Sequence, residues 1–174
     1  MPNFTSGTST SLFVAARNAS SNTGWNVIAT VFFNPVSLAS TRFHFSFNQE
    51  GVATGITLFT NAFVGQVTST PISTSANAIV GFTASSTSST IHVNGNTSTY
   101  SGVSLSNPNS VTEFVLNDAR NSSSTSSDIM IFEVIGFNSQ LSASERQLIE
   151  GYLASKWGLQ PGLPSTHPFK RITP

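Results

Sequence analysis

Paired carboxylates are the first residues to examine, because hydrolysis of a glycosidic bond requires two of them about 5 to 9.5 Å apart on one surface. On a single strand this demands an even spacing, since alternate side chains point to opposite faces. Asp128 and Glu133 are five positions apart, and no Glu-x-Asp-x-Glu motif occurs. The carboxylate pattern therefore disfavours a glycoside hydrolase.

Glu133 is nevertheless unusual, because it interrupts the otherwise apolar run from Ile129 to Phe137. One interpretation is a general acid or base whose pKa is raised by burial. The other is a structural carboxylate paired with Arg17, Lys156 or the backbone, since buried charges persist when they are paired. We favour the structural interpretation.

The histidines offer little support for nucleophilic or metal chemistry. There is no Gly-x-Ser-x-Gly elbow, His-x-His or His-x3-His motif, and Asp118 and Asp128 are ten residues apart. We expect His44 and His92 at solvent-facing strand positions and His167 in packing contacts of the tail. No enzyme activity and no cofactor are predicted, with a calcium ion held by Asp118 and nearby carbonyls as the remaining alternative.

Candidate binding residues lie in polar turns and on the polar face of strands. Aromatic rings with a few Asn amides can bind a sugar without using charge. Trp25 sits in a polar turn, although its ring could instead plug the end of the fold. The predicted ligand-binding residues are Trp25, Asn22 and Asn26 in one turn, Asn94 and Asn96 at a hairpin tip, and His44, Asn48 and His92 on a polar face.

The composition limits the classes of function. The 174 residues carry seven basic and seven acidic side chains, and charged residues make up only 8% of the chain. Such a chain lacks the basic surface that nucleic acid requires. It has no cysteine and no run of eighteen apolar residues, and Met1 to Thr5 show no basic stretch followed by an apolar run, so we expect no disulfides, no membrane span and no signal peptide. We expect one domain covering 1–174.

Short apolar runs of period two fill the chain up to residue 137, separated by Gly, Asn, Ser and Pro clusters. This pattern is typical of an antiparallel sandwich. Asn94-Gly95 predicts a tight hairpin turn, and Asp128 to Phe137 is apolar on both faces, which indicates a central strand. The expected strands are Leu12 to Ala16, Trp25 to Phe33, Thr41 to Asn48, Ile56 to Phe63, Ala78 to Ala84, Thr90 to Val93, a return through Thr99 and Tyr100, Glu113 to Asn117, and Asp128 to Phe137.

One helix is expected at the C-terminal end. Ser142 and Glu145 form a capping box, and Gly158 supplies a stop, which predicts a helix from about 143 to 157. Arg146 and Glu150 are expected to form an exposed pair four residues apart, and prolines should keep the tail 158–174 extended. The expected core stripe contains Leu148, Ile149, Tyr152, Leu153 and Trp157.

The closing segment resembles a known family. Glu133-Val134-Ile135 to Leu141, Ser142-Ala-Ser-Glu-Arg, Glu150-Gly-Tyr-Leu-Ala-Ser-Lys-Trp-Gly-Leu159 and Leu163-Pro-Ser-Thr-His-Pro-Phe169 are similar to the end of laminin-G-like, concanavalin-A-like jelly rolls. The variant most similar occurs in structural and surface proteins of large algal and protist DNA viruses and of marine phages. Ile91 to Gly95 resembles a hairpin of such domains. The resemblance implies a two-sheet antiparallel jelly-roll sandwich.

Two functions follow from this resemblance. The first is a lectin-like module on a virus particle or other extracellular surface, which binds a glycan or a host surface. The second is a purely architectural capsid-associated, fibre or decoration protein with other virion or surface proteins as partners, in which a homo-oligomer is possible. Fold alone does not decide between them.

Overall fold

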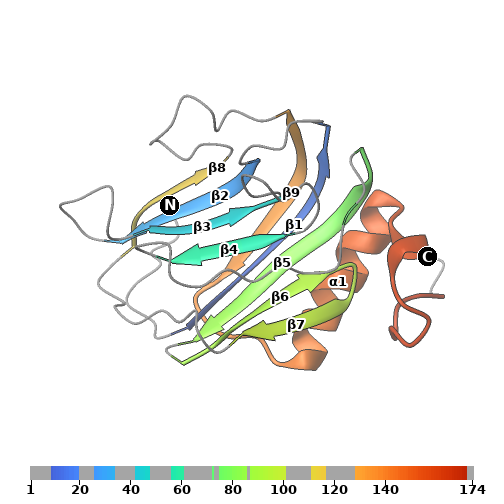
Figure 1. Ribbon diagram of the computed structural model, residues 1–174. Coiled ribbons are helices and arrows are strands. Elements are labelled where there is room, and N and C mark those ends of the chain that lie inside the picture. Colours follow the sequence, from blue (N-terminus) through green and yellow to red (C-terminus); the bar gives the residue numbers. More distant parts are fainter. Residues whose placement is uncertain are drawn as a thin grey trace.

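The fold is taken from a computed structural model of the chain, which describes residues 9–19, 26–33, 42–47, 56–60, 72, 75–85, 87–100, 111–116 and 128–171. These residues form two antiparallel sheets and one long helix (Figure 1). The strands are β1 (Ser9–Asn18), β2 (Val27–Phe33), β3 (Arg42–Ser46), β4 (Thr57–Thr60), β5 (Asn77–Ser85), β6 (Ser89–Val93), β7 (Asn96–Tyr100), β8 (Val111–Leu116) and β9 (Ile129–Phe137). The two-sheet antiparallel jelly-roll sandwich with a C-terminal helix is thereby confirmed.

The strand order places the first described strand inside the larger sheet, between β5 and β9. That sheet has the order β7-β6-β5-β1-β9, and the smaller one has the order β4-β3-β2-β8. Each strand overlaps one of the predicted apolar runs, with bounds that differ by a few residues, because period-two patterning and turn residues determine where a strand can begin and end. The Asn94-Gly95 turn between β6 and β7 is also as predicted.

The space between the sheets holds the main core. β1 contributes Leu12, Val14 and Ala16 to it, and Phe45 of β3 packs edge-on against Phe82 of β5 with ring centroids 5.3 Å apart. Edge-to-face contact is a favoured arrangement of two aromatic rings. Alternate residues of β1 and β5 are thus committed to the interior of the sandwich.

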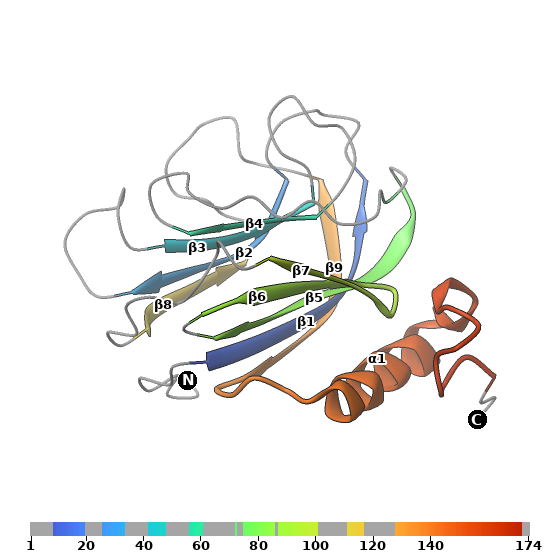
Figure 2. The ribbon, with the colours of Figure 1, turned by 60° about the horizontal axis from the view of Figure 1, so that its bottom comes forward.

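A second apolar cluster covers the opposite face of the five-stranded sheet. Phe13, Ala15 and Ile79 on that face meet Leu153 and Ala154 of helix α1 (Ala143–Trp157). Figure 2 shows α1 and the four-stranded sheet on opposite sides of the five-stranded sheet. Both faces of the larger sheet are therefore buried where the helix crosses it.

β9 differs from the sequence prediction in two respects. It is an edge strand among the described strands, although the run was expected to be central. Its register against β1 shifts between Ala15, which faces Glu133, and Ala16, which faces Ile131, so Phe132 is the extra residue of a bulge. A bulge re-aims side chains: Ile131 and Val134 pack on the inner core and Phe132 on the helix side. Both faces of β9 are apolar because the inner core covers one and α1 covers the other. A neighbouring strand on each edge is not required.

The ends of α1 follow the sequence closely. The Ser142 hydroxyl accepts from the Glu145 amide, the Glu145 carboxylate accepts from the Ser142 amide at 2.9 Å, and Gly158 has the left-handed backbone of a helix stop, with φ of 68°. The tail beyond it was expected to be extended, but it contains the 3₁₀ turn η2 (Gln160–Gly162) and further turns up to Arg171. Lys170 stabilises this path, because its ammonium donates to three backbone carbonyls, those of Gln160, Pro161 and Leu163.

The buried side of α1 is not the predicted one. Leu153 is fully buried and Ile149 is partly buried, but Leu148, Tyr152 and Trp157 are exposed by 56%, 47% and 37%. In their place the helix buries Arg146 and Glu150, the pair that was expected to face solvent. The buried stripe is thus rotated around the helix axis, which is possible because the two opposite charges neutralise each other beneath the helix.

No helix in the described part of the chain is long and apolar enough to cross a membrane.

Candidate functional site

Several of the predicted binding residues cannot be placed. Asn22, Trp25, Asn48 and the calcium candidate Asp118 lie outside the described residues. His44 lies in β3, where its backbone pairs with Thr30 of β2 and Phe59 of β4. A joint site of the Trp25 turn and the Asn94 hairpin remains a prediction.

Asn26 is described, and it is buried. Its backbone carbonyl accepts a hydrogen bond of 2.9 Å from the Phe47 amide, just before β2 begins. The expectation that Asn26 projects from an exposed turn is therefore wrong. A buried amide is satisfied by the protein around it, so Asn26 is not available to an external sugar in this structure.

The β6–β7 hairpin tip is covered by the C-terminal tail. Asn94 has a φ of 46°, and its amide oxygen accepts from the Ile79 amide at 2.8 Å. Gly95 has a φ of 82°, and a Cβ there would lie 2.9 Å from Pro164 and 3.0 Å from His167. Asn94 was predicted to be a free loop residue, but its side chain is used to fasten the turn to β5.

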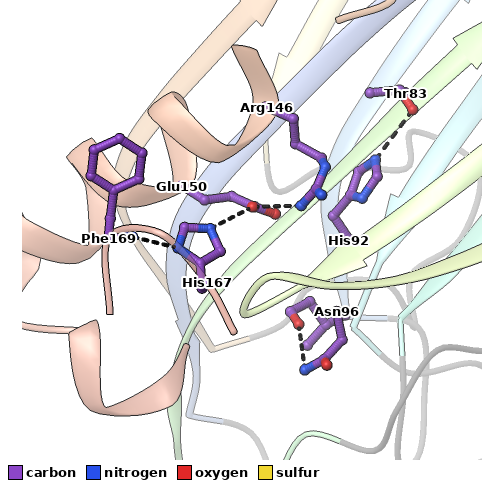
Figure 3. Close-up of polar contacts among 8 residues, drawn as sticks. Thr83, His92, Asn96, Arg146, Glu150, His167 and Phe169 are labelled. Carbon is purple, nitrogen blue, oxygen red and sulfur yellow. Dashed lines mark hydrogen bonds and ion pairs between the residues drawn. The ribbon is translucent and has the colours of Figure 1, made fainter. Parts of the chain in front are cut away.

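Asn96, at the start of β7, is exposed. Its side-chain amide donates to the Val93 carbonyl at a long 3.4 Å, as Figure 3 shows. Of the predicted loop residues in the described part of the chain, Asn96 retains the exposure that a surface ligand would need.

His92 is buried, and the prediction of a solvent-facing position is wrong. The ring faces away from the inner core as expected, but α1 and the tail cover that second face. It stacks on Phe13 with centroids 5.7 Å apart, and its Nε2 lies 3.2 Å from the Thr83 hydroxyl. Burial first, and then the positive charge of Arg146, lower the pKa of His92 to about 3. A neutral buried imidazole of this kind is a packing residue.

Arg146, Glu150 and His167 form a buried group that we call the Glu150 network (Figure 3). One Glu150 oxygen accepts from Arg146 Nη1 at 2.6 Å and lies 3.1 Å from His167 Nε2. The network joins α1 to the tail, and His167 packs in the tail as the sequence predicted. Since each member is at most 8% exposed, no external substrate reaches it in this structure. The network therefore has a structural role, which is to hold the tail against α1.

An exposed polar and aromatic group lies where β9 meets the last two turns of α1. We call it the Glu133 cluster, and it contains Glu133, Tyr152, Lys156 and Trp157. Oε1 of Glu133 accepts from the Tyr152 hydroxyl at 3.0 Å and from Lys156 Nζ at 3.1 Å, while Oε2 accepts from Trp157 Nε1 at 2.9 Å. The predicted pairing of Glu133 with Lys156 is confirmed.

The electrostatics of the Glu133 cluster keep both charges present. Partial desolvation acts to raise the pKa of Glu133, but the hydrogen bonds from Trp157, Lys156 and Tyr152 outweigh it and leave the pKa below its ordinary value. Hydrogen bonds to Tyr152 and then to Glu133 raise the pKa of Lys156. Glu133 is therefore an ionised acceptor at neutral pH, which is the opposite of a general acid held protonated.

The rings of the Glu133 cluster are fixed as well as exposed. Trp157 stacks on Phe132 with centroids 5.3 Å apart and planes inclined by 27°, and its indole N–H is held by Glu133. Lys156 Nζ donates to the Tyr152 hydroxyl at 2.8 Å. Exposed aromatic side chains lose little entropy on binding when their orientation is already set. This surface can therefore offer stacking faces and hydrogen-bonding groups to a ligand.

Sequence reasoning placed Tyr152 and Trp157 in the core and so missed this surface. Both rings were counted with the apolar stripe, because helical spacing does not show which side of the helix meets the sheet. Two features of the sequence could have indicated this surface: Tyr152, Lys156 and Trp157 are spaced to share one side of a helix, and Glu133 is the one acid of an apolar strand. These four residues interact in the structure.

Among the described residues, no three His, Asp or Glu side chains gather closely enough to hold a metal ion.

Comparison with solved structures shows the fold at low sequence identity. The chain is similar to part of a Trypanosoma rangeli sialidase in complex with sialic acid, with a TM-score of 0.64 and 12% identity over 85% of this chain and 23% of that one. It is similar to a K499G mutant of NanB sialidase from Streptococcus pneumoniae, with a TM-score of 0.63 and 16% identity over 82% of this chain and 24% of that one.

A third similar structure is a putative carbohydrate binding protein from Bacteroides ovatus, with a TM-score of 0.58 and 12% identity over 79% of this chain and 39% of that one. The chain thus spans about a quarter of the length of the two sialidases. No protein-family model and no curated protein sequence matches it. None of these three structures is a virus protein, and the likeness concerns the fold alone.

Proposed function

We propose that this protein is a glycan-binding module and that the Glu133 cluster is its binding surface. The observation that carries the proposal is the exposure of two aromatic rings, Tyr152 and Trp157, which Glu133 holds in fixed orientations. Sugars present apolar C–H faces and hydroxyl groups, which suit an aromatic face beside a carboxylate and an ammonium. The similarity of the fold to sialidases and to a putative carbohydrate binding protein supports the same class of ligand.

A glycan array followed by calorimetric titration of the best ligand tests this proposal. Trp157→Ala should weaken binding at least about tenfold, because ring stacking and one hydrogen-bond partner of Glu133 are lost together. Trp157→Phe should retain part of the affinity, since it keeps a ring but not the N–H.

Leu148→Ala is the matched control, because it removes an exposed side chain from the same helix and leaves the four residues of the cluster unsubstituted. Equal loss of sugar binding in Leu148→Ala and Trp157→Ala would contradict the proposal, as would an array without any ligand.

An architectural role is the second candidate, favoured by exposed aliphatic side chains that a sugar would not need. Met130 and Leu148 are exposed by 53% and 56%. A partner protein would bury such side chains at the core of an interface. A stable assembly that is disrupted by Met130→Lys or Leu148→Lys, together with a blank glycan array, would favour this role.

We also propose that the module acts without hydrolysing its ligand. The Glu133 carboxylate is ionised and occupied by three donors, and Glu150 is buried against Arg146 and His167. Oligosaccharide turnover that Glu133→Gln abolishes would refute this part of the proposal.

The resemblance of the C-terminal segment supports display on a virus particle or another extracellular surface, among other virion or surface proteins. Surface labelling of intact particles by an antibody raised against this chain is the expected result, and labelling only after disruption of the particles would contradict it.

A further inference from the structure

We infer that the Glu133 cluster is a cation cage filled by the chain's own Lys156, and that its glycan ligand carries a free, protonated amine. This inference rests on the proposed function and specifies its ligand. Lys156 Nζ lies 5.2 Å from the centroid of the Tyr152 ring and 5.8 Å from that of the Trp157 ring, while bonded to Glu133 at 3.1 Å. Two aromatic rings and one carboxylate around an ammonium are the chemistry by which proteins bind alkylammonium ligands.

The internal ammonium is replaceable. The Lys156 side chain is 47% exposed and flexible, and an ion pair open to water is weak because the solvent screens it. The other three members are held without Lys156: Trp157 by Phe132 and Glu133, and Tyr152 by its own hydrogen bond to Glu133. When Lys156 swings into solvent, two rings and an uncompensated carboxylate are left for another cation.

The chemistry of the emptied cage selects among sugars. A 2-amino sugar with a free amine supplies both an ammonium for Glu133 and a ring for stacking. Its N-acetylated form has no charge to offer, and a sugar acid would place its carboxylate beside that of Glu133, which costs free energy because like charges repel. The predicted ligand class is therefore the de-N-acetylated amino sugars.

The test compares three probes on the full chain: an oligomer of glucosamine, the same oligomer fully N-acetylated, and sialyllactose as a sugar acid. Calorimetric titration at mildly acidic pH, where the amines are protonated, should show that the glucosamine oligomer binds most tightly. Lys156→Ala should tighten its binding by about three- to tenfold, because the internal competitor is removed and the competent state becomes the populated one. Glu133→Gln should weaken it by about tenfold.

Arg171→Ala is the control for charge, since it removes one exposed positive charge and no atom of the cage. It should change the affinity of the glucosamine oligomer much less than Lys156→Ala does. Thermal unfolding of each variant confirms that the fold is intact, and the ligand-induced change in tryptophan fluorescence should disappear in Trp157→Phe.

Lys156→Ala should strengthen sugar binding if Lys156 fills a cage, and should weaken it if Lys156 itself binds the ligand. Weaker binding of sialyllactose in this variant, with no gain for the glucosamine oligomer, would show that Lys156 is itself the ligand-binding group and would overturn the cage. Equal affinity for the two glucosamine oligomers would also overturn it while the glycan-binding function stands. Failure of every sugar to bind any form of the protein would overturn both.

Discussion

Glu150 is a buried carboxylate, and two partners compensate for the loss of its contact with water. Its side chain is 1% exposed and is shared by Arg146 and His167. Removing one member of a buried ion pair costs more than the pair itself contributes, because the remaining charge is left without compensation.

Glu150→Gln is therefore expected to lower the free energy of unfolding by roughly 3 to 5 kcal/mol, measured by urea denaturation. Glu145→Gln is the matched control, since Glu145 lies on the same helix but its carboxylate is exposed at the helix start. A loss in Glu150→Gln no greater than that in the control would show that the Glu150 network does not fasten the tail.

His92 should make the fold sensitive to acid. The folded chain keeps His92 neutral down to about pH 3, whereas an unfolded histidine takes up a proton near pH 6.5. The unfolded state therefore binds more protons between these values. The stability linked to His92 is complete above about pH 6.5 and falls as the pH decreases, by at most roughly 1.4 kcal/mol per pH unit.

The variant His92→Phe retains a ring to stack on Phe13 and cannot be protonated. Urea midpoints measured from about pH 7 to about pH 4 should fall less steeply in this variant than in the natural chain. Parallel pH profiles of the two proteins would contradict the role assigned to His92.

Gly151 allows the tail to dock on α1. A Cβ at this position would lie 2.4 Å from Phe169 Cγ and 2.7 Å from its Cβ, which is too close for the ring to remain in place. Replacement of a helical glycine by alanine normally stabilises a helix by about 1 kcal/mol. Here Gly151→Ala should instead destabilise the chain and release the tail.

Limited proteolysis of the tail, followed with thermal unfolding, measures this effect. Gly158→Ala provides the comparison, because its positive φ makes alanine strained while no atom lies within 4 Å of the added Cβ. It should cost about 1 kcal/mol without exposing the tail to protease. Faster cleavage in Gly158→Ala than in Gly151→Ala would refute the packing argument.

The elements themselves were largely predictable from the sequence. The period-two runs, the Asn94-Gly95 turn and the Ser142–Glu145 capping box are local signals, and local geometry decides them. The bulge at Phe132 was not predicted, because its apolar neighbours give no sign of a shift in alternation and the polar Glu133 was interpreted as a structural carboxylate within a regular strand. The position of β9 at an edge was missed for a similar reason, since cover by a helix and cover by strands leave the same apolar pattern.

The candidate site was less predictable than the fold. Trp157 and Tyr152 look like core residues by type, and Arg146 and Glu150 look like surface residues. Their actual places are exchanged because a neutral ion pair, fastened to His167 twenty-one residues beyond Arg146, fills the space beneath the helix. Only the tertiary structure brings these distant partners together.

Helix α1 and the tail protect one face of the five-stranded sheet. Without them Phe13, Ala15 and Ile79 would face water, since Leu153, Ala154 and Leu163 are what cover them. Exposure of each large apolar side chain costs roughly 2 kcal/mol. A chain ending at Ser139 should therefore be far less stable and should aggregate.

Size-exclusion chromatography and the binding of a hydrophobic dye test this expectation. A chain ending at Arg171 is the control, because it keeps every contact of α1 and the tail described above. A monomeric, cooperatively folding chain that ends at Ser139 would show that the sandwich does not need its helix.

The neighbours of β1 also determine when this chain can fold during its synthesis. β1 lies between β5 and β9, and Thr10 donates to the carbonyl of Phe137, 127 residues further along the chain. A nascent chain must therefore carry the apolar segment from Leu12 to Ala16 without its second neighbour until β9 has been synthesised. Closing so long a loop is slow, and an uncovered apolar strand attracts chaperones or other chains. Folding of this sheet is thus expected to wait until β9 has left the ribosome, with a dependence on chaperones that a shorter-range topology would not have.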